Sequence, residues 1–332
     1  MEADNETSTT VAPRDCIEEE DDHHRDEFAC PMPDVLADKI GDCVVLSIFI
    51  AIGVIGNLLL IISILTTKRM QKPQYYFILS IASADLLVSG YVLPCVLSAR
   101  ISNKNIFTDA QCIFNAFVSF ACTGISNSNF CAIALNRYCF VIKRHLYDRI
   151  FTGRSTLLII LLIWVIWFIY SGVEGATDNF TYLADAFACF NYDEKYVFSA
   201  TFMLAAFGVF LPLCISCFAY GAIFWKLYRI KANLGESADT TLSRDERRAI
   251  FTIMVAFLVF NACWVPYLVQ VITEKMDIHL SNMFHKYSVW MSFFNSSMNA
   301  IVYGLLNAEF RASYLRVIKF TAFKSSRSST SG

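Results

Sequence analysis

Charged residues are scarce in this chain. Asp, Glu, Lys and Arg make up 17% of its 332 residues, whereas hydrophobic residues make up 56%. A soluble domain usually carries about one quarter charged residues. The composition therefore excludes an ordinary soluble domain and favours a protein that exposes apolar surface to lipid.

Catalytic combinations are also missing. The sequence contains no His-Glu-x-x-His motif, and its five histidines are expected outside the apolar segments, so no intramembrane enzyme is predicted. An ion channel or transporter needs several pore-facing charges or an internal repeat. Asp85 and Arg137, at opposite depths, are too few for a pore, and no repeat is apparent. Nothing in the sequence predicts a nucleic-acid partner.

Seven hydrophobic runs divide the chain, and each is long enough to cross a bilayer core of about 30 Å as a helix. They lie at about 44–65, 75–97, 112–142, 156–175, 196–227, 249–272 and 284–306. The predicted fold class is an all-α membrane protein, a seven-transmembrane helix bundle over residues 42–307. Residues 308–320 are expected to form a short amphipathic helix at the interface, followed by a flexible Ser/Thr-rich tail over 321–332.

Basic residues indicate the orientation. They concentrate in the first, third and fifth loops and in the tail, whereas the opposite loops are expected to hold only Arg100, Lys104, Lys195, Lys275 and Lys286. The positive-inside rule then places the N-terminus outside the plasma membrane and the tail in the cytoplasm. Residues 1–41 are acidic and are predicted to be a disordered extracellular segment. They are too polar for a signal peptide, so the first span is expected to direct insertion.

The outer face carries the expected covalent features. Cys112 and Cys189 lie at this oxidising face and are predicted to form a disulfide. A second bridge between Cys16 and Cys30 is left open. The sequons at Asn5 and Asn179 are predicted to be glycosylated on the same side.

Asp85 is the most informative single residue, because a carboxylate at mid-membrane depth must face the bundle interior and find polar partners. Oxygens and amides at similar depth belong to Asn57, Ser126, Asn295 and Asn299. One interpretation is a structural hydrogen-bond cluster with water, and the other is a Na⁺ site built from hard oxygen ligands. The sequence leaves both open and predicts no other cofactor or metal.

Single residues recur about once per span in an order that resembles the class A (rhodopsin-like) G-protein-coupled receptors. They are Asn57, Asp85, Cys112, Arg137, Trp164, Pro212, Trp264, Pro266, Asn299 and Tyr303. The segments Asn136-Arg137-Tyr138-Cys139 and Asn299-Ala300-Ile301-Val302-Tyr303 are most similar to the melatonin receptor subfamily. The resemblance implies a non-enzymatic receptor that is activated by a ligand, signals through an inhibitory heterotrimeric G protein and contacts membrane lipids. It also implies arrestin and a receptor kinase acting at the tail.

The resemblance implies a ligand pocket in the outer half of the bundle. Its expected residues are Ser119, Phe120, Thr123, Glu174, Gly208, Trp264, Tyr267 and Phe293. Ser119 replaces the aspartate of amine receptors, and Phe293 replaces the lysine that binds retinal in opsins. Gly208 and Glu174 differ from the histidine and asparagine of melatonin receptors. A melatonin-like ligand, a peptide and another small molecule all stay open.

The resemblance also implies an activation switch at the inner end. Its expected residues are Asn136, Arg137, Tyr138, Glu246, Tyr220, Asn299 and Tyr303. Arg137 is predicted to pair with Glu246 in the off state, and Asn136, in place of an acid, removes a competing partner. An agonist near Trp264 would let the sixth span pivot at Pro266. The alternative for Arg137 is an arginine that extends to the membrane interface.

Overall fold

The structure is a computed structural model that describes residues 36–177, 180–191, 210–234, 243–276, 278 and 280–329. Several predictions of the sequence therefore lie outside the described residues. They concern residues 1–35 of the N-terminal segment, glycosylation at Asn5 and Asn179, the pairing of Cys16 with Cys30, and the pocket residue Gly208.

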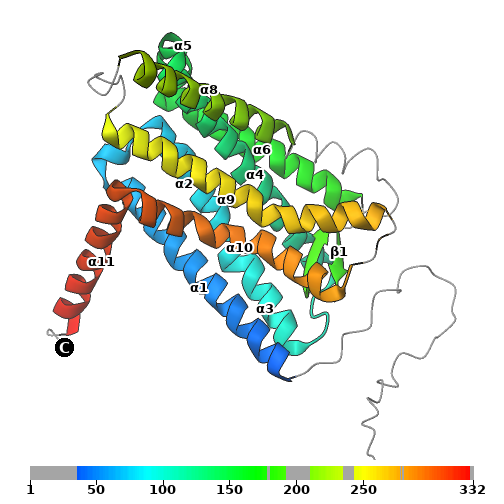
Figure 1. Ribbon diagram of the computed structural model, residues 1–332. Helices are drawn as coiled ribbons and strands as arrows, with labels where there is room; N and C mark the ends of the chain where they lie inside the picture. Colours follow the sequence, from blue (N-terminus) through cyan, green and yellow to red (C-terminus); the bar gives the residue numbers. More distant parts are fainter. Residues whose placement is uncertain are drawn as a thin grey trace, which may run out of the picture.

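Long helices run side by side along most of the described chain (Figure 1). They are α1 (Leu36–Thr66), α2 (Pro73–Leu87), α3 (Leu93–Ser102), α4 (Asp109–Ile142), α6 (Gly153–Ala176), α8 (Leu211–Leu234), α9 (Arg244–Lys275) and α10 (Asn282–Leu306). The short helices η1 (Lys68–Met70) and α5 (Arg144–Ile150) connect them at one end of the bundle. Since α1 begins at Leu36, residues 36–41 are helical and not part of a disordered segment.

Six helical stretches of the described chain are long and apolar enough to cross a membrane, with α2 and α3 counted as one stretch. The helix of the seventh predicted span, α10, falls outside that group. It carries many buried polar residues, which lower its hydropathy, including Lys286, Ser292, Asn295 and Asn299. It nevertheless lies inside the bundle beside α1 and α9 (Figure 1).

A widened turn joins α2 to α3. Residues Val88–Val92 form a π-helix, η2, directly before Pro94. Proline has no backbone N–H to donate to the carbonyl four residues earlier, and a π-turn accommodates that loss. Because a π-turn adds a residue, the side chains of α3 are rotated by about 100° relative to a continuous α-helix.

A β-hairpin covers the end of the bundle where α1 and α10 begin (Figure 1). Strands β1 (Phe180–Leu183) and β2 (Ala188–Asn191) pair antiparallel, with Phe180 opposite Asn191 and Leu183 opposite Ala188. A disulfide joins Cys189 of β2 to Cys112 of α4, which confirms the predicted bridge. It ties the hairpin to the helix at the centre of the bundle.

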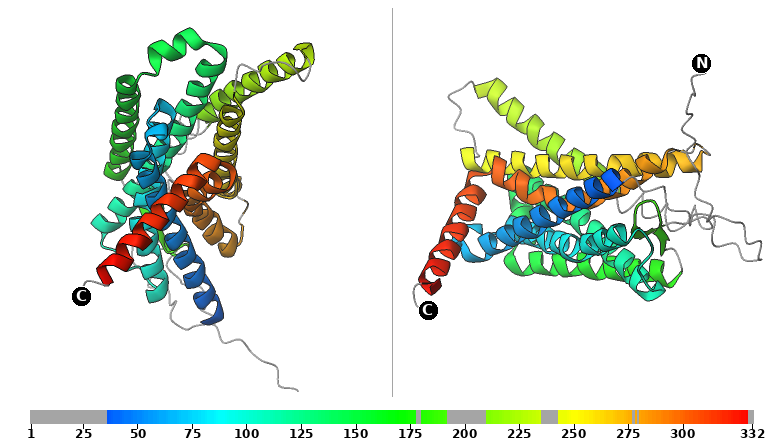
Figure 2. Two further views of the ribbon diagram at one scale, coloured as in Figure 1. Left: turned by 90° about the vertical axis from the view of Figure 1, so that its left-hand side faces the viewer. Right: turned by 90° about the horizontal axis from the view of Figure 1, so that it is seen from below.

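The C-terminal helix α11 (Ala308–Ser329) leaves the bundle at a steep angle (Figure 2). It begins where the sequence predicted, but it continues past residue 320 into the segment that was expected to be flexible. Its range contains neither proline nor glycine, the two residues that most often end a helix. Phe310 anchors its first turn, because the ring is fully buried and lies 5.1 Å from the ring of Tyr303.

Candidate functional site

Three predicted pocket residues converge near the hairpin. Trp264 and Tyr267 of α9 and Phe293 of α10 all contact the ring of Phe190 from β2, at centroid distances of 6.5, 5.1 and 5.8 Å. Phe190 is buried. The sequence reasoning missed this residue, although its position directly after the disulfide cysteine fixes it against the bundle. The hairpin thus places an aromatic ring against Trp264, the pocket residue near which the sequence placed the agonist.

The other described pocket residues lie on the α4 side. Ser119 is buried, Thr123 is half-buried, and Phe120 packs against Tyr170 of α6 and Phe180 of β1 with both ring centroids 5.9 Å away. Glu174 of α6 is also buried, which agrees with an inward position and not with the headgroup region. These residues lie where α4, α6 and β1 pack together.

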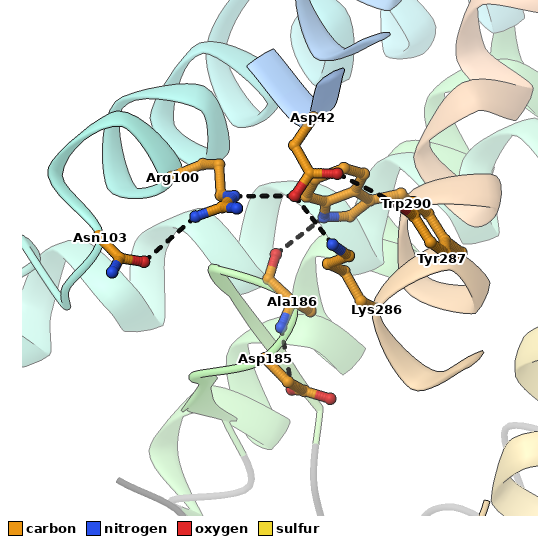
Figure 3. Close-up of polar contacts among 8 residues, drawn as sticks. All are labelled: Asp42, Arg100, Asn103, Asp185, Ala186, Lys286, Tyr287 and Trp290. Atoms are coloured by element: carbon orange, nitrogen blue, oxygen red, sulfur yellow. Dashed lines mark hydrogen bonds and ion pairs between the residues drawn. The ribbon is translucent and has the colours of Figure 1, made fainter. Parts of the chain in front are cut away.

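A buried ion cluster, which we call the outer clamp, joins three helices at the end of the bundle that the hairpin covers (Figure 3). Asp42 of α1 accepts from Nε of Arg100 in α3 and from Nζ of Lys286 in α10, both at 2.8 Å to the same oxygen Oδ2. The side chains are between 2% and 4% exposed. The prediction that Arg100 and Lys286 lie in loops is therefore wrong, since both stand on helices and face inward.

The hairpin is attached to the outer clamp. Nε1 of Trp290 donates to the carbonyl of Ala186 at 2.8 Å (Figure 3), and the guanidinium of Arg100 lies 4.8 Å from the ring centre of Phe187. His285 of α10 forms a hydrogen bond with Asp185 of the hairpin turn. The expectation that every histidine lies outside the spans thus fails for His285, which is in the first turn of α10.

These contacts could have been suspected from one signal in the sequence. Lys286 lies within the hydrophobic run 284–306, where lipid disfavours an unpaired ammonium group. Such a residue requires an acidic partner inside the bundle. Its identity as Asp42 depends on how the helices pack.

Asp85 is held between two helices at the centre of the bundle. Nδ2 of Asn299 donates to Oδ2 at 2.6 Å, and the hydroxyl of Ser126 donates to Oδ1 at 3.3 Å. Asn295 is buried in α10, one helical turn before Asn299 and therefore on the same face, and its Oδ1 has no hydrogen-bond partner among the described residues. The carboxylate, the serine hydroxyl and an unsatisfied amide oxygen are hard ligands of the kind that Na⁺ prefers, so these residues fit the ion.

At the inner end, Arg137 is buried but does not pair with Glu246 within the described part of the chain. Its Nη2 donates to Oδ1 of Asn136 at 2.9 Å, so Asn136 is a partner of the arginine and not a missing competitor. Glu246 accepts instead from the backbone N–H of Ser243 at 2.8 Å, while its own N–H donates to the Ser243 hydroxyl. This capping box starts α9 and holds Oε2 of Glu246, so the carboxylate attracts Arg137 from a distance but makes no direct ion pair with it. Because Arg137 is 2% exposed, extension to the interface is also excluded.

Two tyrosines of the predicted switch lie in the same inner core. Tyr303 is fully buried and Tyr220 almost so, and neither hydroxyl has a hydrogen-bond partner among the described residues. Tyr220 packs against Phe257 of α9 at 6.4 Å. Tyr138 packs at the edge of the same core, where its ring contacts that of the exposed Phe218 of α8. Two free hydroxyls in a buried core are ready to accept new partners when the helices shift.

Comparison with known proteins agrees with this architecture. The sequence profile of the family described as "7 transmembrane receptor (rhodopsin family)" matches residues 56–303, from α1 to α10. The human melatonin receptor type 1B is 30% identical over 289 residues, which cover 82% of this chain and 77% of that receptor. The Gallus gallus melatonin receptor type 1C is 28% identical over 283 residues, with 84% and 82% covered. The Mus musculus type 1A receptor is 28% identical over 293 residues, with 87% and 82% covered.

Proposed function

Because this chain belongs to the rhodopsin family of seven-transmembrane receptors, we propose that it senses a melatonin-like ligand outside the cell and lowers cyclic AMP through an inhibitory G protein. The family establishes a multi-pass plasma-membrane receptor with a ligand and a G protein as partners. The identity of the ligand, the class of G protein and the extracellular placement of the N-terminus are the proposed parts. The basic residues at the α5 end of the bundle support that orientation.

The aromatic cluster around Phe190 carries the proposal for the ligand. Trp264, Tyr267 and Phe293 surround that ring at 5.1 to 6.5 Å, and flat aromatic molecules bind well among such side chains. The three receptors compared above are named for melatonin, whose indole ring suits this environment. The buried carboxylate of Glu174 favours a second candidate, a cationic peptide or other cationic small molecule.

A cell-based cyclic AMP assay tests the function. Cells expressing the chain should show reduced forskolin-stimulated cyclic AMP when an indoleamine panel headed by melatonin is applied, and pertussis toxin should remove the effect. An Arg137→Ala variant at equal surface expression serves as the signalling-deficient control. A response to cationic peptides alone would favour the second candidate, and a rise in cyclic AMP would contradict inhibitory coupling.

The inner core supports a switch in which Arg137, Tyr220 and Tyr303 exchange partners. A ligand that displaces or presses on Phe190 acts directly on Trp264, two residues before the kink at Pro266. Movement of α9 then brings the unpartnered tyrosine hydroxyls within reach of the guanidinium. The Ser/Thr-rich tail is proposed to be the site at which a receptor kinase and arrestin end signalling.

Replacing Glu246 tests how the off state is held. Glu246→Gln keeps the capping box, since glutamine serves at this position, and should leave ligand-free signalling unchanged. Glu246→Ala removes half of the box and should destabilise the start of α9 by about 1 kcal/mol. Ligand-free cyclic AMP suppression is measured for both at matched expression. Higher basal signalling in Glu246→Gln would show that a charge pair with Arg137 holds the off state.

A further inference from the structure

A groove with basic residues at one end opens between α4 and α8, and we call it the inner groove. It has a volume of about 500 Å³ and is lined by Tyr138 and Ile142 of α4 and by Ala222, Trp225, Lys226 and Arg229 of α8, among others. It lies toward the end of the bundle where α5 connects α4 to α6. It takes no part in the ligand pocket or in the polar cluster around Asp85.

The inner groove faces away from the bundle interior. Tyr220 marks the inward face of α8, because it is buried against Phe257 of α9. With about 100° between successive residues of an α-helix, Ala222, Trp225 and Arg229 lie on the opposite face. Trp225 is 64% exposed. Lipid can therefore reach the groove directly.

The polarity along the inner groove matches that of a phospholipid. Phe218, Ala222, Trp225 and Arg229 follow one another on the same face of α8, with the apolar residues toward the middle of the membrane and the arginine at its edge. Trp225 stacks on Tyr228, with ring centroids 6.3 Å apart, as aromatic residues do at the level of the headgroups. An acyl chain fits the apolar part, and a headgroup fits the basic end.

Among the described residues, Lys226 and Arg229 of the inner groove have no acidic partner. Nζ of Lys226 donates to the carbonyl of Val141, near the end of α4, at 2.6 Å. An ammonium group has three N–H donors, so two remain. Within the described part of the chain, no carboxylate lies within 4 Å of Lys226 or Arg229. A half-buried cation without an anion is costly, and a phosphate oxygen would satisfy it with strong charge-assisted hydrogen bonds.

From these observations we propose that the inner groove binds an acidic phospholipid of the leaflet at the basic end of the bundle. The headgroup phosphate lies between Lys226 and Arg229, and an acyl chain lies over Trp225 and Ala222. The lipid also covers the junction of α4 and α8, where Lys226 already links the two helices. This site rests on the proposed orientation but not on the identity of the receptor's ligand.

Fluorescence of Trp225 tests the proposal in the full-length receptor. The purified chain is placed in nanodiscs that contain brominated phosphatidylserine or brominated phosphatidylcholine in a background of unlabelled phosphatidylcholine. The signal of Trp225 is the difference between the wild type and Trp225→Phe. The groove should prefer brominated phosphatidylserine over brominated phosphatidylcholine by about fivefold for each basic side chain that contacts the headgroup, and quenching of Trp225 should be stronger accordingly. High salt should reduce this preference.

A charge-neutral variant identifies the cause of the preference. Lys226→Gln combined with Arg229→Gln removes both charges but keeps polar side chains with N–H donors on this face of α8, so the fold should be retained and the preference should disappear. Arg154→Gln, at an exposed position in the first turn of α6, is the matched control and should keep it. Equal quenching by the two lipids in the wild type would overturn the proposal. The proposal would also be overturned if the double variant kept its lipid preference but lost G-protein recruitment. That result would assign the groove to the G protein.

Discussion

Replacing Asp42 with asparagine is expected to lower the free energy of unfolding by about 3–5 kcal/mol, the usual cost of removing one member of a buried ion pair. The Asp42 carboxylate oxygen Oδ2 accepts from Arg100 and Lys286, each at 2.8 Å. Without the negative charge, two cations would remain close together in a site where the side chains are at most 4% exposed. Thermal unfolding can be followed with a thiol-reactive dye, because Cys122 and Cys263 are buried.

Two further variants separate charge burial from a general effect of mutation. Asp148→Asn breaks the ion pair between Arg144 and Asp148, whose two side chains are 60% and 61% exposed. This change should alter the free energy of unfolding by only about 0–1 kcal/mol. Lys286→Met introduced into Asp42→Asn removes one of the stranded cations and should recover part of the loss. Similar destabilisation by Asp42→Asn and Asp148→Asn would rule out the outer clamp as a main source of stability.

Replacing Asp85 with asparagine is expected to abolish any effect of sodium on signalling. If Na⁺ binds among Asp85, Ser126 and Asn295 and favours the off state, sodium should shift the activation equilibrium of the wild type by roughly 5- to 150-fold, the usual range for coupled sites. Asparagine keeps the size of the side chain but removes the charge that attracts the ion. Ligand-free nucleotide exchange on the G protein, measured in sodium chloride and in choline chloride, gives the result without a known agonist.

The matched control is Asp109→Asn, an exposed acid in the first turn of α4, which should keep the sodium response. A wild type that signals equally in both salts would favour the other interpretation of the site, a hydrogen-bond cluster with water. A sodium response that survives in Asp85→Asn would place the ion elsewhere.

Much of the fold could be predicted because it depends on local properties. The length and hydropathy of each run decide whether it becomes a spanning helix. Polar residues within a run must face the bundle interior, whichever residues they contact there. The structure accordingly brings Asp85, Ser126 and Asn299 into contact. The sequence also paired Cys112 with Cys189 correctly, because it expected both residues at the same end of the bundle.

The remaining contacts depend on distances that no local pattern contains. Glu246 was expected to hold Arg137 because it begins the right helix, but its carboxylate closes a capping box with Ser243. Phe190 was overlooked because its position after Cys189 places it near the bundle but does not show that a hairpin carries its ring to Trp264. In each case, a short-range hydrogen bond or a strand pairing decided which of several partners a side chain meets.

By itself, the sequence determined that this chain is a helical membrane protein, approximately where its spans lie, and which polar groups must lie inside, although α1 begins at Leu36 and not near residue 44, and α8 ends at Leu234 and not near residue 227. Those properties follow from the cost of exposing charge and backbone to lipid, which is the same in any arrangement of helices. Only the tertiary structure decided that Asp42, Arg100 and Lys286 meet. Their contact requires the rotation of α3 by the π-turn at Val88–Val92 and the packing of α10 against α1. The three residues are far apart in the chain, so no local pattern shows that they meet.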